Sequence, residues 1–293
     1  MIVWDAIASA ISHARRRPFI LNNHFPVGGG CINESYCLEG TDGSRYFLKL
    51  NDARHLPMFS AESESLNAVS ATNTVRVPQV IAFGSAGILS YLVLEYMELC
   101  SSGNSRLLGE QLAMLHRSTS PRFGFAHSNY IGTNPQPNDW KSNWADFWCE
   151  HRLGFQLHLA EQNGFGRQLT RLGEKLMGHL PAFFDGYIPQ PALLHGDLWS
   201  GNHAFLADGM PVIFDPAAYY GDRECDLAMT ELFGGYPADF YAAYRAAYPP
   251  DTGYAMRKDL YNLYHILNHA NLFGRGYVKQ AELMMLRLIA SCS

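Results

Sequence analysis

Long hydrophobic runs are missing from this sequence of 293 residues. A membrane-spanning helix needs roughly 18 or more apolar residues in a row, and the longest candidate, around 88–94, already contains Ser90 and Tyr91. An apolar segment does occur near the N-terminus, but Arg15-Arg16-Arg17 follows it, whereas a secretory signal places its positive charge first. We therefore expect no membrane association, and we interpret the arginines as the end of a first helix.

An excess of positive charge and a set of paired cysteines are also absent. The net charge is −5, which argues against a nucleic-acid-binding surface. Six cysteines are present, but no two of them have the spacing of a zinc or redox motif. Six is also too few for a disulfide scaffold in a chain of this length. The sequence thus predicts free thiols and a cytoplasmic location.

Hydrophobic residues make up 47% of the chain, and their pattern changes along it. In the first third, short apolar segments alternate with turns such as Asp42-Gly43, which is typical of antiparallel strands. Later, from about residue 107, the pattern becomes mostly helical. The sequence predicts an α+β fold with two lobes. We expect a small nucleotide-binding lobe (1–95), a hinge (96–99) and a larger helical lobe that carries catalysis and substrate (100–293).

One helix is predicted in the small lobe, over residues 58–71, with Ser60 as its N-cap. Phe59, Glu62 and Leu66 fall at helical spacing, so Glu62 points inward with the apolar residues. An inward carboxylate needs a partner, because an unpaired buried charge is very costly. Lys49, near the end of the preceding predicted strand, is the candidate.

The segment from His195 to Asn202 carries the most specific motif. His-x-Asp followed by four residues and Asn is the spacing of a kinase catalytic loop. A predicted β-hairpin follows and ends at Asp215, which would bring Asn202 and Asp215 to about 5 Å from each other at the backbone. Two oxygen ligands so placed suit Mg²⁺. Asp197 lies outside this pair and is the candidate base for a substrate hydroxyl.

Upstream residues occur in the order that ATP binding would require. Gly28-Gly29-Gly30 would let backbone N–H groups approach phosphates closely. Lys49, held by Glu62, would neutralise the α- and β-phosphates. Glu95-Tyr96-Met97, between the lobes, would offer backbone groups to adenine. We therefore predict ATP and Mg²⁺ as the cofactors.

Segments spread over nearly the whole chain resemble the fructosamine kinase (ketosamine 3-kinase) family, in the aminoglycoside-phosphotransferase branch of the protein-kinase-like fold. The similar segments are 28–33, 47–51, 58–62, 93–96, 112–116, 129–132, 135–138, 195–202 and 215–229. The most distinctive is the last, where Asp215-Pro216-Ala217 replaces the Asp-Phe-Gly of protein kinases. The resemblance implies ATP-dependent phosphorylation of the sugar 3-hydroxyl of a ketosamine, an amine modified by glycation. The 3-phosphate would then decompose and release the amine, which is deglycation.

Four further residues have two interpretations each. Trp199 could stack on a sugar ring or pack inside its loop. His265 and His269 lie four residues apart on a predicted helix and could line the substrate cleft or only pack. Cys31, directly after the glycines, is a candidate for reversible oxidation. The protein would then be a monomer or a redox-dependent homodimer.

Two other functions stay open at this point. One is another small-molecule kinase of the same fold, acting on an aminoglycoside, choline or homoserine hydroxyl. The other is a pseudokinase binding module, although the presence of Lys49, Asp197, Asn202 and Asp215 argues against it.

His203 departs from the small or aliphatic residue expected after Asn202. The sequence does not separate ribulosamine from fructosamine substrates, or free from protein-bound ones.

Overall fold

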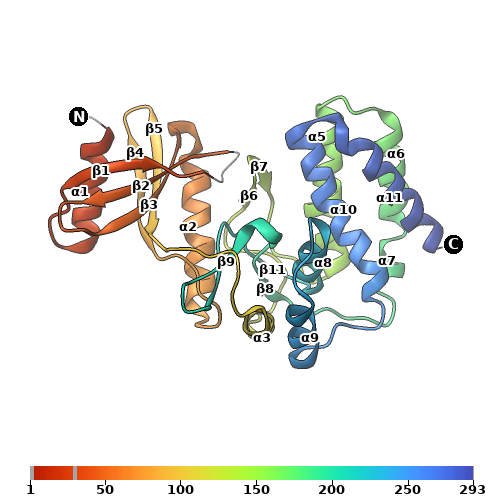
Figure 1. Cartoon of the computed structure of the whole chain (residues 1–293). Coiled ribbons are helices and arrows are strands. Elements are labelled where there is room, and N and C mark those ends of the chain that lie inside the picture. The colour runs from red at the N-terminus through yellow and green to blue at the C-terminus, as the bar shows by residue number, and fades with distance from the viewer. Residues whose placement is uncertain (1–2, 29–31, 293) are drawn as a thin grey trace.

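The computed structural model describes residues 3–28 and 32–292 and has a small half with a sheet and a larger helical half (Figure 1). The small half contains α1 (Val3–Arg15), β1 (Leu21–Pro26), β2 (Glu34–Gly40), β3 (Arg45–Asp52), α2 (Leu56–Ala71), β4 (Val80–Ala86) and β5 (Leu89–Glu95). The predicted strands and the predicted helix are all present. Gly29, Gly30 and Cys31, which the sequence singled out, lie outside the described residues.

The five strands form one antiparallel sheet in the order β1-β2-β3-β5-β4. Alternate residues of a strand point to opposite faces, and β5 shows this clearly. Tyr91 and Val93 belong to the same buried cluster as Ile7 and Ile11 of α1, whereas Leu92 and Leu94 pack in the cluster that contains Phe59 of α2. The two helices therefore cover opposite faces, and β5 is the buried centre of the small half.

Helix α2 begins four residues earlier than the predicted N-cap, so the assignment of Ser60 is wrong. A 3₁₀ turn, Ala53–His55, leads directly into the helix, and the side chain of Asp52 accepts a hydrogen bond from the Arg54 N–H at the start of that turn. Pro57 lies in the first turn of α2, where its missing N–H costs nothing. Glu62 consequently lies well inside the helix.

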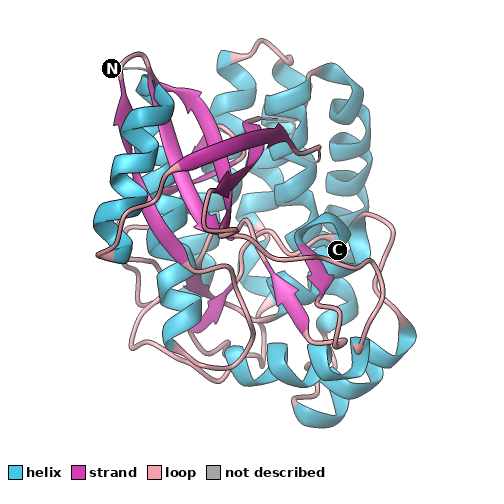
Figure 2. Ribbon diagram, turned by 60° about the vertical axis from the view of Figure 1, so that its left-hand side comes forward, coloured by secondary structure: helices cyan, strands magenta, loops and turns pink. Residues whose placement is uncertain are grey.

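The larger half is mostly helical, with short two-stranded ladders between the helices (Figure 2). Its helices are α3 (Ser105–Leu115), α4 (Trp144–Trp148), α5 (Phe155–Gln162), α6 (Arg167–Gly178), α7 (Leu180–Phe183), α8 (Glu224–Leu232), α9 (Ala238–Ala247), α10 (Tyr254–Phe273) and α11 (Val278–Ser291). Its strands are β6 (Asn129–Ile131), β7 (Asn134–Gln136), β8 (Ala192–Leu194), β9 (His203–Phe205), β10 (Pro211–Ile213) and β11 (Tyr219–Gly221). Helix α10 is the centre of this half, since Leu263, Ile266 and Leu267 are fully buried.

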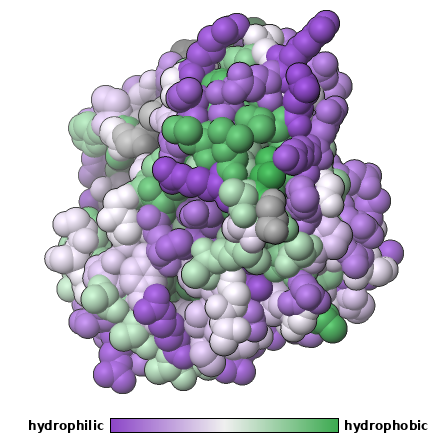
Figure 3. All heavy atoms as spheres, turned by 90° about the vertical axis from the view of Figure 1, so that its right-hand side faces the viewer, coloured by the Kyte–Doolittle hydropathy of each residue, from purple (hydrophilic) through white to green (hydrophobic). Residues whose placement is uncertain are grey.

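Within the described residues, no helix is long and apolar enough to span a bilayer. Figure 3 views the end of the molecule formed by the helical half and shows hydrophobic side chains gathered in one area with hydrophilic ones around it. Leu283 and Leu286 of α11 are among the exposed apolar residues, at 44% and 48%. Single exposed leucines of this kind are common on the surface of folded proteins.

Candidate active site

A cavity of about 580 Å³ lies between the two halves of the molecule. Strands β3 and β5 and helix α2 supply one side of it, and the loops around β6, β9 and β10 supply the other. At one end, α10 lines the cavity with Asn268, His269, Leu272 and Phe273. Predicted site residues that line it are Gly28, Lys49, Glu62, Glu95, Met97, Asp197, Trp199, Asn202, Asp215 and His269.

Lys49 lies between two carboxylates from different parts of the chain. Its Nζ is 2.6 Å from Glu62 Oε1 and 2.8 Å from Asp215 Oδ1. The predicted Lys49–Glu62 pair is thus confirmed, and Asp215 is an additional partner. Burial disfavours the charged ammonium, but the two carboxylates outweigh it, so the pKa of Lys49 is raised above its ordinary value. The Lys49 ammonium therefore stays charged and is held in place on the side of the cavity that the small half forms.

The loop that carries Asp197 is held by a buried carboxylate behind it. Asp226 accepts hydrogen bonds from the backbone N–H groups of His195 and Gly196, at 2.7 and 2.9 Å. His195 donates from Nε2 to the Phe214 carbonyl, and its Nδ1 accepts from the Asp197 N–H. Gly196 has φ +85, and a Cβ there would lie 2.1 Å from the Ala217 oxygen. Only glycine fits at 196, and His195 braces the loop rather than facing the cavity.

Asp197 has an unusual electrostatic environment. Burial, together with the negative charges of Asp215 and Asp226, raises the pKa of its carboxyl to about 7, against the opposing effect of the Asn202 hydrogen bond. A carboxylate with a raised pKa is a better proton acceptor than an ordinary aspartate, because the strength of a base follows its pKa. The environment of Asp197 is therefore suited to general base chemistry.

The hairpin β9–β10 brings Asn202 and Asp215 together, as the sequence predicts. The Phe214 N–H donates to the Asn202 carbonyl at 3.0 Å, which places the two ends of the hairpin side by side. The Asn202 amide Nδ2 donates to the Asp197 carbonyl at 2.8 Å. Asp215 has φ +58, a conformation that non-glycine residues adopt rarely. Asn202 Oδ1 and Asp215 Oδ2 take part in none of these contacts.

The part of the cavity next to residues 96–99 is largely apolar. The residues that line it are Val27, Phe47, Pro78, Leu94, Met97, Leu99, Val212 and Phe214. The side chain of Glu95 bonds to Arg76 and to the Gln79 N–H. Only the backbone of Glu95 is therefore available for the predicted hydrogen bonds to adenine. The Tyr96 ring lies under the Arg45 guanidinium at 4.6 Å and is not part of the lining. Phe47 and Phe214 were not singled out by the sequence, because an aromatic residue in a strand is usually core.

Trp199 and His269 line the cavity, whereas His265 does not. Trp199 is 38% exposed beside Asp197. His265 is buried behind Asp197, with its Nδ1 3.9 Å from Asp197 Oδ1, and it is not part of the cavity lining. Burial, with a contribution from His269, lowers the pKa of His265 to about 3, so the ring is neutral. His203 packs on Tyr236 at 4.2 Å between ring centroids and also lies outside the lining.

The hairpin β6–β7 is a part of the site that reasoning from the residues missed. Its turn lines the cavity with Tyr130, Ile131 and Gly132. Behind it, Asn129 Nδ2 donates to the Ala218 carbonyl at 2.8 Å, and Gln136 Nε2 donates to the Ala217 carbonyl at 3.1 Å. These amides fix the segment directly after Asp215. The segments 129–132 and 135–138 were matched to a family, but no function followed from their residue types.

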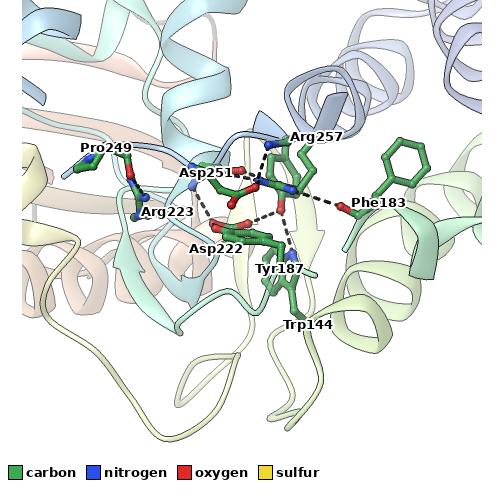
Figure 4. A network of polar contacts seen from close by, with 11 residues as sticks. Trp144, Phe183, Tyr187, Asp222, Arg223, Pro249, Asp251 and Arg257 are labelled. Carbon is green, nitrogen blue, oxygen red and sulfur yellow. Dashed lines mark hydrogen bonds and ion pairs between the residues drawn. The ribbon is translucent and has the colours of Figure 1, made fainter. Parts of the chain in front are cut away.

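A second polar network lies inside the helical half, away from the cavity lining (Figure 4). Arg257 of α10 pairs with Glu224 of α8 at 2.8 Å and with Asp251 at 2.7 Å. Asp222 accepts hydrogen bonds from Tyr187 and Tyr261. The network joins the start of α8 to α10 and to the loop before it, so the Asp222-Arg223-Glu224 run braces the helical half.

Comparison with known proteins gives matches over almost the full length of the chain. A family model described as fructosamine kinase matches residues 3–291. A protein of Synechocystis named "Probable ketoamine kinase" is 49% identical over 290 residues, covering 96% of this chain and 95% of that protein. "Protein-ribulosamine 3-kinase, chloroplastic" of Arabidopsis thaliana is 42% identical over 261 residues, covering 87% of this chain and 79% of its own length.

Solved structures agree with these matches. A crystal structure of a Haemophilus somnus protein named "Putative fructosamine-3-kinase" aligns with a TM-score of 0.89 at 28% identity and covers 97% of both chains. An ADP-bound aminoglycoside phosphotransferase aligns with a TM-score of 0.61 at 12% identity, covering 99% of this chain and 95% of the other. At that identity the likeness concerns the fold alone, which is the protein-kinase-like α+β fold that the sequence predicts.

Proposed function

The chain belongs to the fructosamine kinase family, and we propose that it transfers the γ-phosphoryl group of ATP to the sugar 3-hydroxyl of a ketosamine. The observation that carries this proposal is the placement of Lys49, Asp197, Asn202 and Asp215 around one cavity between the two halves. A binding module without chemistry needs no general base among its cavity residues. The family match and this arrangement together favour a ketosamine kinase over the other functions considered above.

In this proposal, adenine binds at the apolar end of the cavity, which Phe47 and Phe214 line, and the phosphates lie toward Lys49. Gly28 lines the same end; Gly29 and Gly30 remain predicted phosphate-binding residues. Asn202 Oδ1 and Asp215 Oδ2 are hard oxygen ligands, which suit Mg²⁺. This ion typically binds one or two protein oxygens together with phosphate oxygens. When bound, Mg²⁺ would neutralise the charge that develops on the phosphates.

The reaction needs one proton transfer and one exchange of bonds. Asp197 accepts the proton of the sugar 3-hydroxyl, whose oxygen forms a bond to the γ-phosphorus. The bond between the γ-phosphorus and the bridging oxygen breaks, and ADP leaves with that electron pair. Lys49 contributes positive charge at the phosphates, and the rest of the rate enhancement comes from positioning.

The acceptor would enter beside Trp199, whose exposed ring can stack on the sugar. His265 supports Asp197 from behind, and His269 lines the acceptor end. The names of the plant relatives, which specify protein-ribulosamine, support a ketosamine carried by a protein. The 3-phosphate would then decompose and release the amine. A cytoplasmic location, a redox role of Cys31 and a monomer or redox-dependent homodimer remain predictions.

A phosphate-transfer assay tests the proposal, with ribulose-lysine and fructose-lysine offered both free and on a glycated protein. We expect transfer to a ketosamine that exceeds transfer to aminoglycosides, choline and homoserine. Asp197→Asn is expected to abolish transfer while ATP binding persists, because the carboxylate is needed only to accept the proton. Preference for another hydroxylated amine, or parental turnover by Asp197→Asn, would contradict the assignment.

A further inference from the structure

One face of helix α10 leads from Asp197 to the mouth of the cavity. His265, His269 and Phe273 follow one another at steps of four residues on this face. Their exposure rises in the same order: His265 is 5% exposed, His269 is half-buried, and Phe273 is 57% exposed. A substrate whose reacting hydroxyl lies at Asp197 therefore has its remaining atoms beside His269 and then Phe273.

Aromatic rings surround His269. Its ring centroid is 4.8 Å from that of Phe233, 5.4 Å from that of Phe273 and 5.3 Å from that of Tyr277. Trp199 continues the series, 6.5 Å from Phe233. We call these five rings the aromatic wall: Trp199, His269 and Phe273 line the cavity, and Phe233 and Tyr277 pack against His269 from outside the lining. Faces of aromatic rings attract a cation held within about 6 Å, most strongly where water is partly excluded.

His269 presents a hydrogen-bond acceptor from this wall. Its Nδ1 lies 2.8 Å from the His265 carbonyl oxygen, and because a carbonyl can only accept, Nδ1 carries the proton. Burial lowers the pKa of His269, so the ring is neutral and Nε2 keeps its lone pair. A neutral acceptor among aromatic rings suits an N–H group that carries a positive charge.

The charges around the cavity favour the same ligand. Among its described lining residues, Lys49 is the one cation, and it is committed to two carboxylates. The lining carboxylates are Glu62, Glu95, Asp197 and Asp215. The cavity thus offers no cationic partner for an anionic group near the aromatic wall, whereas a cation there gains from the overall negative potential.

A ketosamine has its amine at a matching distance from the reacting oxygen. The 3-oxygen and the amine nitrogen are separated by four covalent bonds, roughly 5 Å when extended, and the four-residue step from His265 to His269 is about 6 Å along the helix axis. We propose that the aromatic wall, with His269 Nε2 as acceptor, binds the protonated secondary amine of the ketosamine. This inference rests on the proposed function and deepens it, because it makes the charged amine the feature by which the site selects its substrate.

The test compares two acceptors that differ only at this nitrogen. They are a 1-deoxy-1-(propylamino)ketose and the corresponding 1-O-propylketose, in which an uncharged ether oxygen replaces the amine. For the parent enzyme we expect kcat/KM to favour the amine roughly 10- to 30-fold, the range of a cation–π contact combined with a hydrogen bond. His269→Leu and Phe273→Leu are expected to reduce this ratio several-fold, because they weaken the use of the amine more than that of the ether.

Phe83→Leu, at an exposed phenylalanine of the small half, is the matched control and should keep the parental ratio. The ratio is measured within one protein, so partial unfolding of a variant lowers both substrates together and leaves it unchanged. Equal use of amine and ether by the parent overturns the subsite alone. An amine-to-ether ratio in His269→Leu and Phe273→Leu equal to that of the parent also overturns the subsite alone. If the parent binds ATP but phosphorylates neither probe, the proposed function fails and the subsite with it.

Discussion

Lys49 joins two separate parts of the chain at the site. It links a helix of the small half, through Glu62, to Asp215 at the end of the catalytic hairpin. Removing one carboxylate leaves the ammonium free to turn toward the other. Its position, and not only its charge, is therefore what the pairing with Glu62 provides.

Glu62→Gln is expected to lower kcat/KM for ATP roughly 10- to 100-fold, because a hydrogen bond to a charged group contributes about 1.5–3 kcal/mol. Steady-state kinetics at varied ATP measures this effect. Glu64→Gln is the control, since Glu64 lies on the exposed side of the same helix and pairs with the exposed His127. Equal losses in the two variants would remove the special role of Glu62.

Buried neutral histidines make stability depend on pH. Burial lowers the pKa of His151, and lowers that of His265 to about 3, from a reference of 6.5 in both cases. Below pH 6.5 these histidines bind protons in the unfolded chain but not in the folded protein. Their contribution to the free energy of unfolding therefore falls as the pH falls, and it does not change with pH above that range.

Thermal unfolding between pH 5 and pH 8 checks this dependence. The raised pKa of Asp197 acts in the opposite direction over this range, and it does so equally in the parent and the variant. We therefore expect the curves to differ, with His151→Gln losing less Tm toward pH 5 than the parent loses. His158→Gln, at an exposed histidine, should follow the parental curve. A His151→Gln curve parallel to that of the parent would contradict the argument.

The Lys49–Glu62 pair could be predicted from the sequence because helical spacing fixes the direction of Glu62. The contact of Lys49 with Asp215 could not, since 166 positions separate the two residues and no local pattern records which hairpin end meets which strand. The raised pKa of Asp197 was equally hidden, because it depends on the burial of that side chain and on two distant carboxylates.

Among the elements, the β6–β7 hairpin does the most to shape the acceptor end. Its turn meets α10 at Gly132, which has φ +65. A Cβ at this position would come within 2.6 Å of Leu272 Cδ1. A side chain at position 132 would therefore displace Leu272 from its place against the turn.

Gly132→Ala is expected to raise the KM for the ketosamine several-fold with little change in the KM for ATP, because Leu272 must shift into the acceptor end. Gly43→Ala is the matched control: Gly43 has φ +76, and a Cβ there meets nothing within 4 Å. Both variants carry the same kind of backbone strain, so similar acceptor KM values in the two would show that the contact with Leu272 does not matter.

Element types were largely predictable, whereas their exact starts were not. The catalytic loop and the β9–β10 hairpin follow from a motif and a turn that are contiguous in sequence. The start of α2 depends on a 3₁₀ turn, and the assignment of Ser60 followed the usual preference for serine at N-caps without considering Pro57 in the first turn. The β6–β7 hairpin was missed as part of the site because its amides bond to backbone near Asp215, far along the chain.

At the scale of the whole molecule, the helical half has its own anchor in the Arg257 network (Figure 4). Arg257 and Glu224 are 2% and 0% exposed. Removing one member of a buried ion pair leaves the other charge without compensation. The network is remote from the cavity lining, so its loss should affect folding before it affects substrate binding.

Arg257→Ala is expected to reduce the free energy of unfolding by about 3–5 kcal/mol, as measured by urea denaturation. The neighbouring Lys258 pairs with Glu231 at a partly exposed position, and Lys258→Ala should cost about 1 kcal/mol or less. The KM for ATP in Arg257→Ala should match that of the parent wherever the variant is folded. Similar losses for the two variants would contradict the assignment of Arg257 as an anchor.

The two-lobed α+β plan was predictable because strand and helix periodicities occupy different parts of the chain. The division at 96–99 remains a prediction. The contacts between the two halves could not be predicted from the sequence, since they are backbone hydrogen bonds and ion pairs between residues far apart in the chain.

One backbone pair joins the two halves beside the catalytic hairpin. Ile213 of β10 donates a hydrogen bond to the Arg76 carbonyl, whereas the pair of Phe205 with Cys100 lies within the larger half and would move with it. Rotation of the halves about 96–99 would have to break the Ile213–Arg76 bond together with the Lys49–Asp215 ion pair. We therefore expect ligands to exchange through the exposed end of the cavity at Phe273, while the two halves keep their relative position.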